Sequence, residues 1–198
     1  MWSFYCCGVR CRVSLLFPAF LTALLLCQPE GLAVTCLLAS VLHEGGHLLA
    51  MLLLGVPPED CVLGVFGLRM HLGHRMAGYG RYLGIALAGP LTNGAAALVL
   101  TALGRPQTAA VHGVLAALNL LPISVLDGGE ILRCSLCMAG MERMAEPLLR
   151  LTSAAVLVLL CACGMWLWLV EHANPSLPVV CIYLAVMLFF SEKNEKNS

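Results

Sequence analysis

Long apolar runs separated by short polar segments are the dominant pattern along this chain. A helix that spans a bilayer needs about 20 apolar residues. Six segments approach or reach that length and predict six transmembrane helices, at residues 13–27, 33–54, 82–103, 109–126, 148–170 and 178–190. The first and last are short, and the first contains Pro18. We therefore expect an all-α polytopic membrane protein whose residues 1–198 form a single integral-membrane domain.

Composition supports a membrane protein and argues against a nucleic-acid partner. The hydrophobic set makes up 60% of the chain and charged residues only 11%, with a formal net charge of zero. An ordinary globular domain carries about 25% charged residues, and nucleic-acid binding calls for a basic surface. The first apolar segment, flanked by Arg10 and Arg12, could be taken for a signal peptide. No small-x-small cleavage site follows it, so we interpret it as a retained span.

The distribution of basic residues predicts the orientation. Loops on the cytoplasmic side of membrane proteins are enriched in Lys and Arg. With an inner N-terminus and six spans, ten of the eleven basic residues are cytoplasmic and only Arg105 is outside. The ten are Arg10, Arg12, Arg69, Arg75, Arg81, Arg133, Arg143, Arg150, Lys193 and Lys196. We expect an integral protein of the cell's inner or plasma membrane with both termini in the cytoplasm.

The second apolar segment contains the most polar cluster of the apolar regions, HEGGH at residues 43–47. His43 and His47 are four residues apart, so on a helix they share a face and can reach one metal ion. Glu44 lies one step round the helix, where it can contact water instead of the metal. The alternative is a buried histidine pair satisfied by hydrogen bonds. Ionisable groups inside a membrane segment are costly and usually functional, which favours the metal site.

A catalytic zinc site needs a third protein ligand, and Asp127 is the candidate. Such sites use three protein ligands and leave the fourth position open. Asp127 lies in NLLPISVLDGGE, at the end of the fourth apolar segment. Only Glu44 and Asp127 are acidic residues within or at the edge of an apolar segment, apart from the flanking turns. Taken alone, Asp127 is better explained as an ordinary turn residue in Asp-Gly-Gly.

Three motifs together resemble the site-2 protease family of intramembrane zinc metalloproteases. They are HEGGH, AGPLTN at residues 88–93 and NLLPISVLDGG at residues 119–129, in the order and membrane placement typical of that family. The six-span layout is similar to the stage IV sporulation protein FB subgroup, which processes a sigma-factor precursor. Because the sequence ends at Ser198, we expect neither that subgroup's nucleotide-sensing CBS domain nor a PDZ domain.

The resemblance implies a zinc endopeptidase. It makes His43, His47 and Asp127 the ligands of Zn²⁺ and Glu44 the catalytic base. Its substrate would be a membrane-embedded or membrane-proximal protein segment, cleaved in regulated intramembrane proteolysis. A sigma-factor precursor or an anti-sigma factor is the candidate substrate class, and membrane-protein regulators are candidate partners.

The resemblance also implies supporting roles for three further residues. Asn119 and Pro122 belong to the motif that presents Asp127. Asn93 closes the GPxxN motif, and the resemblance suggests that it positions substrate or an oxyanion.

The segment between the second and third apolar segments is too short to span a membrane. Residues 61–72, CVLGVFGLRMHL, are rich in Val, Leu and Gly. We interpret them as a membrane-dipping β-hairpin whose edge pairs with an extended substrate; the alternative is an ordinary cytoplasmic loop. His71 and His74 in this region are better explained as surface residues than as ligands.

Other functions remain open from the residues alone. A metal-binding or transport protein would use the same His and Asp cluster without needing Glu44 as a base. A catalytically silent binder of membrane segments is disfavoured by the intact His, Glu and Asp. Cys134 and Cys137 form a lone CxxC, which is a weak metal signal and is better explained by packing.

Overall fold

The computed structural model describes residues 2–6, 9–13, 31–64, 67–72 and 78–170, together with positions 181, 184–186 and 188. The chain forms two compact units, Met1–Ala117 and Leu118–Ser198. Most of the first and last predicted spans, 13–27 and 178–190, lies outside the described residues. The described part is mostly helical, as the sequence predicts, but it also contains four strands.

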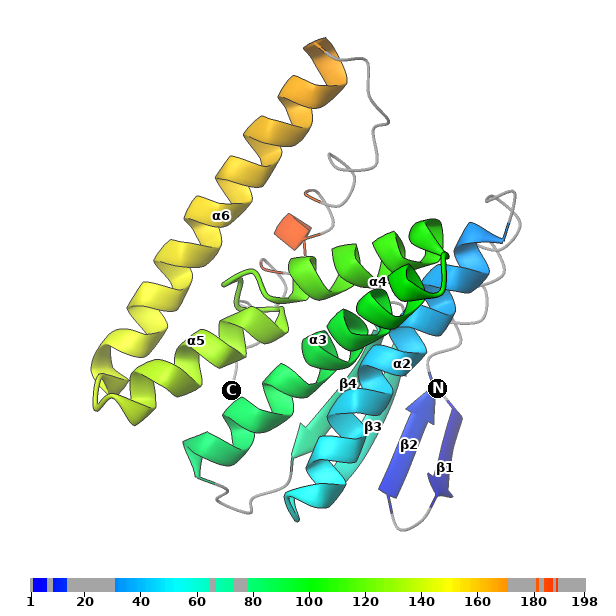
Figure 1. The fold of residues 1–198 in the computed structure, drawn as a ribbon. Helices are drawn as coiled ribbons and strands as arrows, with labels where there is room; N and C mark the ends of the chain where they lie inside the picture. Colours follow the sequence, from blue (N-terminus) through cyan, green and yellow to red (C-terminus); the bar gives the residue numbers. More distant parts are fainter. Residues whose placement is uncertain are drawn as a thin grey trace. The chain divides into compact units, whose positions relative to one another are not determined.

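The first unit contains both helices and strands (Figure 1). In chain order they are β1 (Trp2–Cys6), β2 (Val9–Val13), α2 (Leu32–Leu53), β3 (Pro58–Gly64), β4 (Gly67–Leu72), α3 (Tyr79–Ala102) and α4 (Pro106–Asn119), whose last two residues belong to the second unit. The ranges predicted for the second and third spans, 33–54 and 82–103, agree with α2 and α3 to within three residues.

The strands form one sheet in the order β1-β2-β3-β4. The pairs β1–β2 and β3–β4 are antiparallel, and β2 runs parallel to β3. The sequence does not predict β1 and β2, although VRCRV in β2 alternates apolar and polar residues as a half-buried strand does. β3 and β4 pair over a stretch that begins at Pro58, three residues before the segment 61–72 for which the sequence predicts a hairpin. The depth of this pair in a membrane stays a prediction.

Helices α2 and α3 pack closely because a glycine lies where they meet. A Cβ atom on Gly46 would lie 2.5 Å from Thr92 Oγ1 and 2.9 Å from the carbonyl oxygen of Ala88. Real side chains do not approach so closely, so the backbone of α2 can rest against α3 only with glycine at this position. Gly45, the neighbouring glycine, faces open space.

The second unit contains α5 (Asp127–Met138) and α6 (Glu142–Val170), joined by a short turn in which Gly140 has a φ of 76° (Figure 1). The structure corrects the sequence prediction at two points in this region. The fourth apolar segment, 109–126, is not one helix: α4 ends at Asn119 and a loop follows. The fifth predicted span, 148–170, begins earlier, at Glu142, because its polar first turns are helical too.

Three described helices, α2, α3 and α6, are long and apolar enough to cross a membrane. Each exposes large apolar side chains, for example Leu53 at 77%, Leu98 at 75% and Val158 at 68%. Extended apolar surfaces of this kind are costly in water and are covered by hydrocarbon in a bilayer. The chain therefore has the character of an integral membrane protein.

Candidate metal centre

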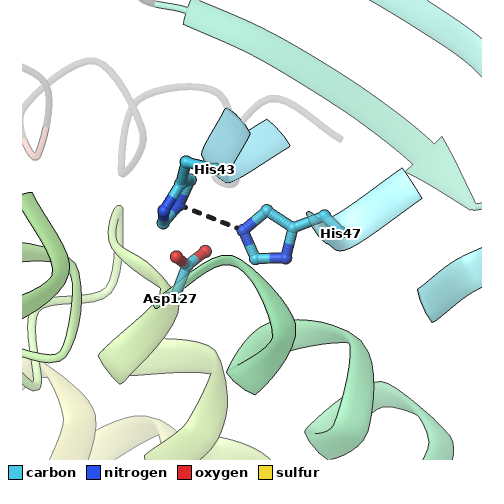
Figure 2. Close-up of side chains that lie close together, drawn as sticks. All are labelled: His43, His47 and Asp127. Atoms are coloured by element: carbon cyan, nitrogen blue, oxygen red, sulfur yellow. Dashed lines mark hydrogen bonds between the residues drawn. The ribbon is translucent and has the colours of Figure 1, made fainter. Parts of the chain in front are cut away.

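Two buried histidines form the centre of the site in the first unit. His43 and His47 lie on one face of α2, and their side chains are only 5% and 8% exposed. Their Nε2 atoms are 3.2 Å apart, and the rings meet edge to face. Figure 2 shows the two rings and the contact between them. The i, i+4 spacing thus brings together the two nitrogen atoms that a metal ion would use.

The backbone of α3 determines which ring nitrogen of His47 carries the proton. Nδ1 of His47 lies 2.7 Å from the carbonyl oxygen of Ile85. A carbonyl oxygen only accepts hydrogen bonds, so Nδ1 carries the proton and donates it. In the neutral ring Nε2 then keeps its lone pair. Metal-binding histidines are commonly oriented in this way, with the second ring nitrogen donating to a carbonyl group.

His43 is held by a chain of buried side chains that crosses from α2 to α4. Its Nδ1 atom is 3.3 Å from Nδ2 of Asn93, which is fully buried on α3. The other end of that amide, Oδ1, is 3.0 Å from Nδ1 of His112 on α4. The sequence singles out Asn93 but not His112. The signal was present, because His112 is a polar residue inside the apolar segment 109–126.

A glycine of α3 leaves room for both imidazoles. A Cβ atom on Gly89 would collide with Nε2 of His47 and would lie 2.8 Å from Cε1 of His43. Any side chain at this position would therefore occupy the space beside the two ligand nitrogens. Gly89 is the glycine of AGPLTN, and the sequence gives that motif a role only through Asn93.

In the second unit, Asp127 is the first residue of α5, not the last residue of a span. The loop before it folds tightly against the start of α5. A Cβ atom on Gly128 would collide with the carbonyl groups of Leu120 and Leu121, and one on Gly129 with that of Ile123. The Gly-Gly pair after Asp127 therefore permits this close packing of backbone on backbone. The positive end of the helix dipole also stabilises an ionised carboxylate at this position.

The remaining predicted residues occupy these same elements. Glu44 is half-buried on α2, directly after His43. Asn119 is the last residue of α4, and Pro122 lies in the loop that leads to Asp127; both are half-buried. Their roles in presenting Asp127 stay predictions.

One group of side chains in the described part of the chain could hold a metal ion: His43, His47 and Asp127, all drawn in Figure 2. This set offers two imidazole nitrogens and a carboxylate oxygen. It fits zinc, whose catalytic sites take three such ligands and leave one position open for water or substrate.

Cys134, the first cysteine of the CxxC pair on α5, is a packed thiol. Cys134 is fully buried, and its Sγ atom lies 3.3 Å from Oε1 of Glu130. Burial, reinforced by the Glu130 charge, raises the pKa of the Cys134 thiol to about 12. The thiolate is the form that binds metals and reacts, so a raised pKa disfavours both. This observation favours the packing interpretation.

Comparison with known proteins identifies a related fold. The chain is similar to the solved structure of a site-2 protease from Methanocaldococcus jannaschii, with a TM-score of 0.64 and 21% sequence identity over 92% of each chain. Neither a scan against protein-family models nor a search of curated proteins finds a match. At this level of identity the likeness establishes the fold alone.

Proposed function

We propose that this protein is an intramembrane zinc endopeptidase of the site-2 protease type. The observation that carries the proposal is the His43–His47 pair, two buried imidazoles whose Nε2 atoms lie 3.2 Å apart on a helix apolar enough to span a membrane. A fold similar to a solved site-2 protease supports it. Burying two imidazoles in such a helix is costly unless they have a use.

In this proposal His43, His47 and Asp127 hold one zinc ion. When bound, the ion supplies Lewis-acid chemistry, polarising the scissile carbonyl and making water a stronger acid near neutral pH. The hydrogen bond from His47 to the Ile85 carbonyl and the contact between His43 and Asn93 orient the two rings. Asp127 is the first residue of α5, where a carboxylate can serve as the third ligand.

Glu44 acts as the general base. It follows His43 on α2, so it projects about 100° round the helix from that ligand. From there its carboxylate takes a proton from the attacking water and passes it to the leaving amine. The two glycines after Glu44 have separate uses: Gly46 allows the contact with α3, and Gly45 leaves the helix surface beside Glu44 open.

The substrate class is a membrane-embedded or membrane-proximal segment of a protein. The apolar surfaces of α2, α3 and α6 support chemistry in or near the bilayer. A helical substrate must unwind before cleavage, because helix hydrogen bonds shield its peptide groups. β4 lies at one edge of the described sheet, and an extended segment can add to such an edge through backbone hydrogen bonds.

The deciding experiment is Glu44→Gln, co-expressed with candidate single-span proteins from the same genome. This change keeps shape but removes the base, so cleavage should fall by about 10²–10⁴-fold while zinc stays bound. Glu142→Gln, an exposed acid at the start of α6, is the matched control and should cleave normally. Near-normal turnover in Glu44→Gln would contradict the role. Metal movement across the membrane without proteolysis in either form would instead support a transporter.

A further inference from the structure

The buried imidazole of His112 has no part in the chemistry proposed above. It is 6% exposed on α4, and its Nδ1 atom is 3.0 Å from Oδ1 of Asn93. The nitrogen of the same carboxamide is 3.3 Å from Nδ1 of His43. Three side chains from α4, α3 and α2 therefore form one hydrogen-bonded relay that ends on a proposed zinc ligand.

The relay can run in two directions, and the first is unsuited to metal binding. In this direction His112 donates from Nδ1 to Asn93 Oδ1, and Asn93 Nδ2 donates to His43 Nδ1. The neutral His43 ring then carries its proton on Nε2. That proton can be shared with Nε2 of His47, 3.2 Å away. A protonated Nε2 has no lone pair for a metal ion.

The second direction leaves His43 ready to bind. If the Asn93 carboxamide turns over, its oxygen and nitrogen exchange places and both contacts persist. His43 Nδ1–H then donates to Oδ1, and Nδ2 donates to His112 Nδ1. Each ring stays neutral and the number of protons is unchanged, since one proton moves from Nε2 to Nδ1 on His43 and another from Nδ1 to Nε2 on His112. The lone pair of His43 now lies on Nε2.

We propose that His112 is a positioning residue for the metal site. By accepting a hydrogen bond at Nδ1 it turns the Asn93 oxygen toward His43 and holds His43 in the tautomer whose Nε2 binds zinc. The inference rests on the proposed zinc site. It gives Asn93 a role in setting the tautomer of His43. It also adds a residue of α4 to the groups that orient this ligand. Such outer partners typically change metal affinity by about 10- to 100-fold.

The first test is zinc affinity of the full-length protein in detergent, measured by competition with a chromophoric chelator. His112→Leu removes the acceptor and should weaken zinc binding by about 10- to 100-fold. His112→Asn places an amide oxygen near the position of Nδ1 and should restore affinity to within about threefold. Thr108→Val, a half-buried change one turn away on α4, is the control and should bind as the wild type does.

Nitrogen-15 NMR of the histidine rings in the wild-type protein gives a second test that needs no variant. Titration with zinc should shift His43 to the Nδ1–H tautomer and His112 to Nε2–H. Unchanged zinc affinity in His112→Leu, or a zinc-loaded protein in which His112 keeps its proton on Nδ1, would overturn the inference. Failure of the wild type to bind zinc would contradict the proposed function itself, so the two failures are distinguishable.

Discussion

Gly89 is the residue on which the space beside the two histidines depends. Because a Cβ atom there would collide with His47 Nε2, we expect Gly89→Ala to displace the rings. Overpacking of this kind costs about 1–3 kcal/mol, so zinc affinity should fall roughly 5- to 150-fold. Chelator competition measures the change.

Gly45→Ala is the matched control for that substitution. Gly45 lies on α2 with open space where its Cβ would be. The Gly45→Ala variant should keep full zinc affinity. Its helix should be more stable by about 1 kcal/mol, because alanine favours helix more than glycine does. Equal loss of zinc in the Gly45 and Gly89 variants would show that the steric argument is wrong.

Cys134 provides a pH-dependent prediction. Its pKa is about 12 in the folded protein, against an ordinary 9.0, so folding favours the neutral thiol. Alkylation by iodoacetamide at pH 8, followed by mass spectrometry, should be much slower at Cys134 in the folded than in the denatured protein. A raised folded pKa also means that the free energy of unfolding should fall as pH rises from about 9 toward 12. Equal alkylation rates in the two states would refute the assignment.

At the level of single residues, sequence spacing predicts local geometry and little beyond it. The His43–His47 pair follows from the i, i+4 rule, and the structure places the two rings together. The partners of His43 could not be predicted in this way, because Asn93 is 50 residues distant and His112 lies on a third helix. Such contacts depend on how helices pack, which local periodicity does not encode.

Among the elements, the junction of α4 and α5 departs furthest from the sequence prediction. Residues 120–126 are as apolar as a helix, so a hydropathy window joins them to α4. They form a loop because their polar backbone groups find partners in the fold. Ile123 N donates to Leu121 O, Leu126 N to Ile123 O, and Ser124 N to Ser153 Oγ on α6. α2 and α3 were predictable because each is a long, uninterrupted apolar run.

The packing of this loop on α5 predicts the effect of Gly128→Ala. The added methyl group would collide with the carbonyl groups of Leu120 and Leu121 and would push the start of α5 outward. Asp127 would move with it, so zinc binding should be lost, as measured by metal analysis of the purified protein.

Gly140→Ala is the control for this element. Gly140 lies in the turn after α5 with a φ of 76°, and no atom lies within 4 Å of where its Cβ would be. Alanine there should cost about 1 kcal/mol of stability through backbone strain without affecting zinc. If Gly128→Ala retained one equivalent of zinc, the loop would not be what positions Asp127.

For the whole molecule, the strand pairing in the sheet bears on the predicted orientation of the chain in the membrane. In the β2–β3 pair Arg10 is the register partner of Asp60, and Arg12 that of Val62. The basic N-terminal segment and the segment after α2 therefore lie at the same end of the first unit, as the distribution of Lys and Arg requires. The orientation and the count of six spans stay predictions.

Reporter fusions test this orientation. Fusions at Ser198 should be active in the cytoplasm, and a fusion after Gly104 should be active outside, because Arg105 is the only basic residue expected there. Cytoplasmic activity at both positions would show that the third predicted span does not cross the membrane. External activity at Ser198 would show that the number of spans is not even.

The close contact at Gly46 also bears on how a substrate of the proposed protease would enter. Backbone and side chain meet there without an intervening Cβ, and hydrogen bonds from His47 to Ile85 and between Asn93 and His43 cross the same boundary. Separating α2 from α3 would break all of these contacts at once. We therefore expect the two helices to move together, so that a substrate of the proposed protease would enter through a boundary other than the one between α2 and α3.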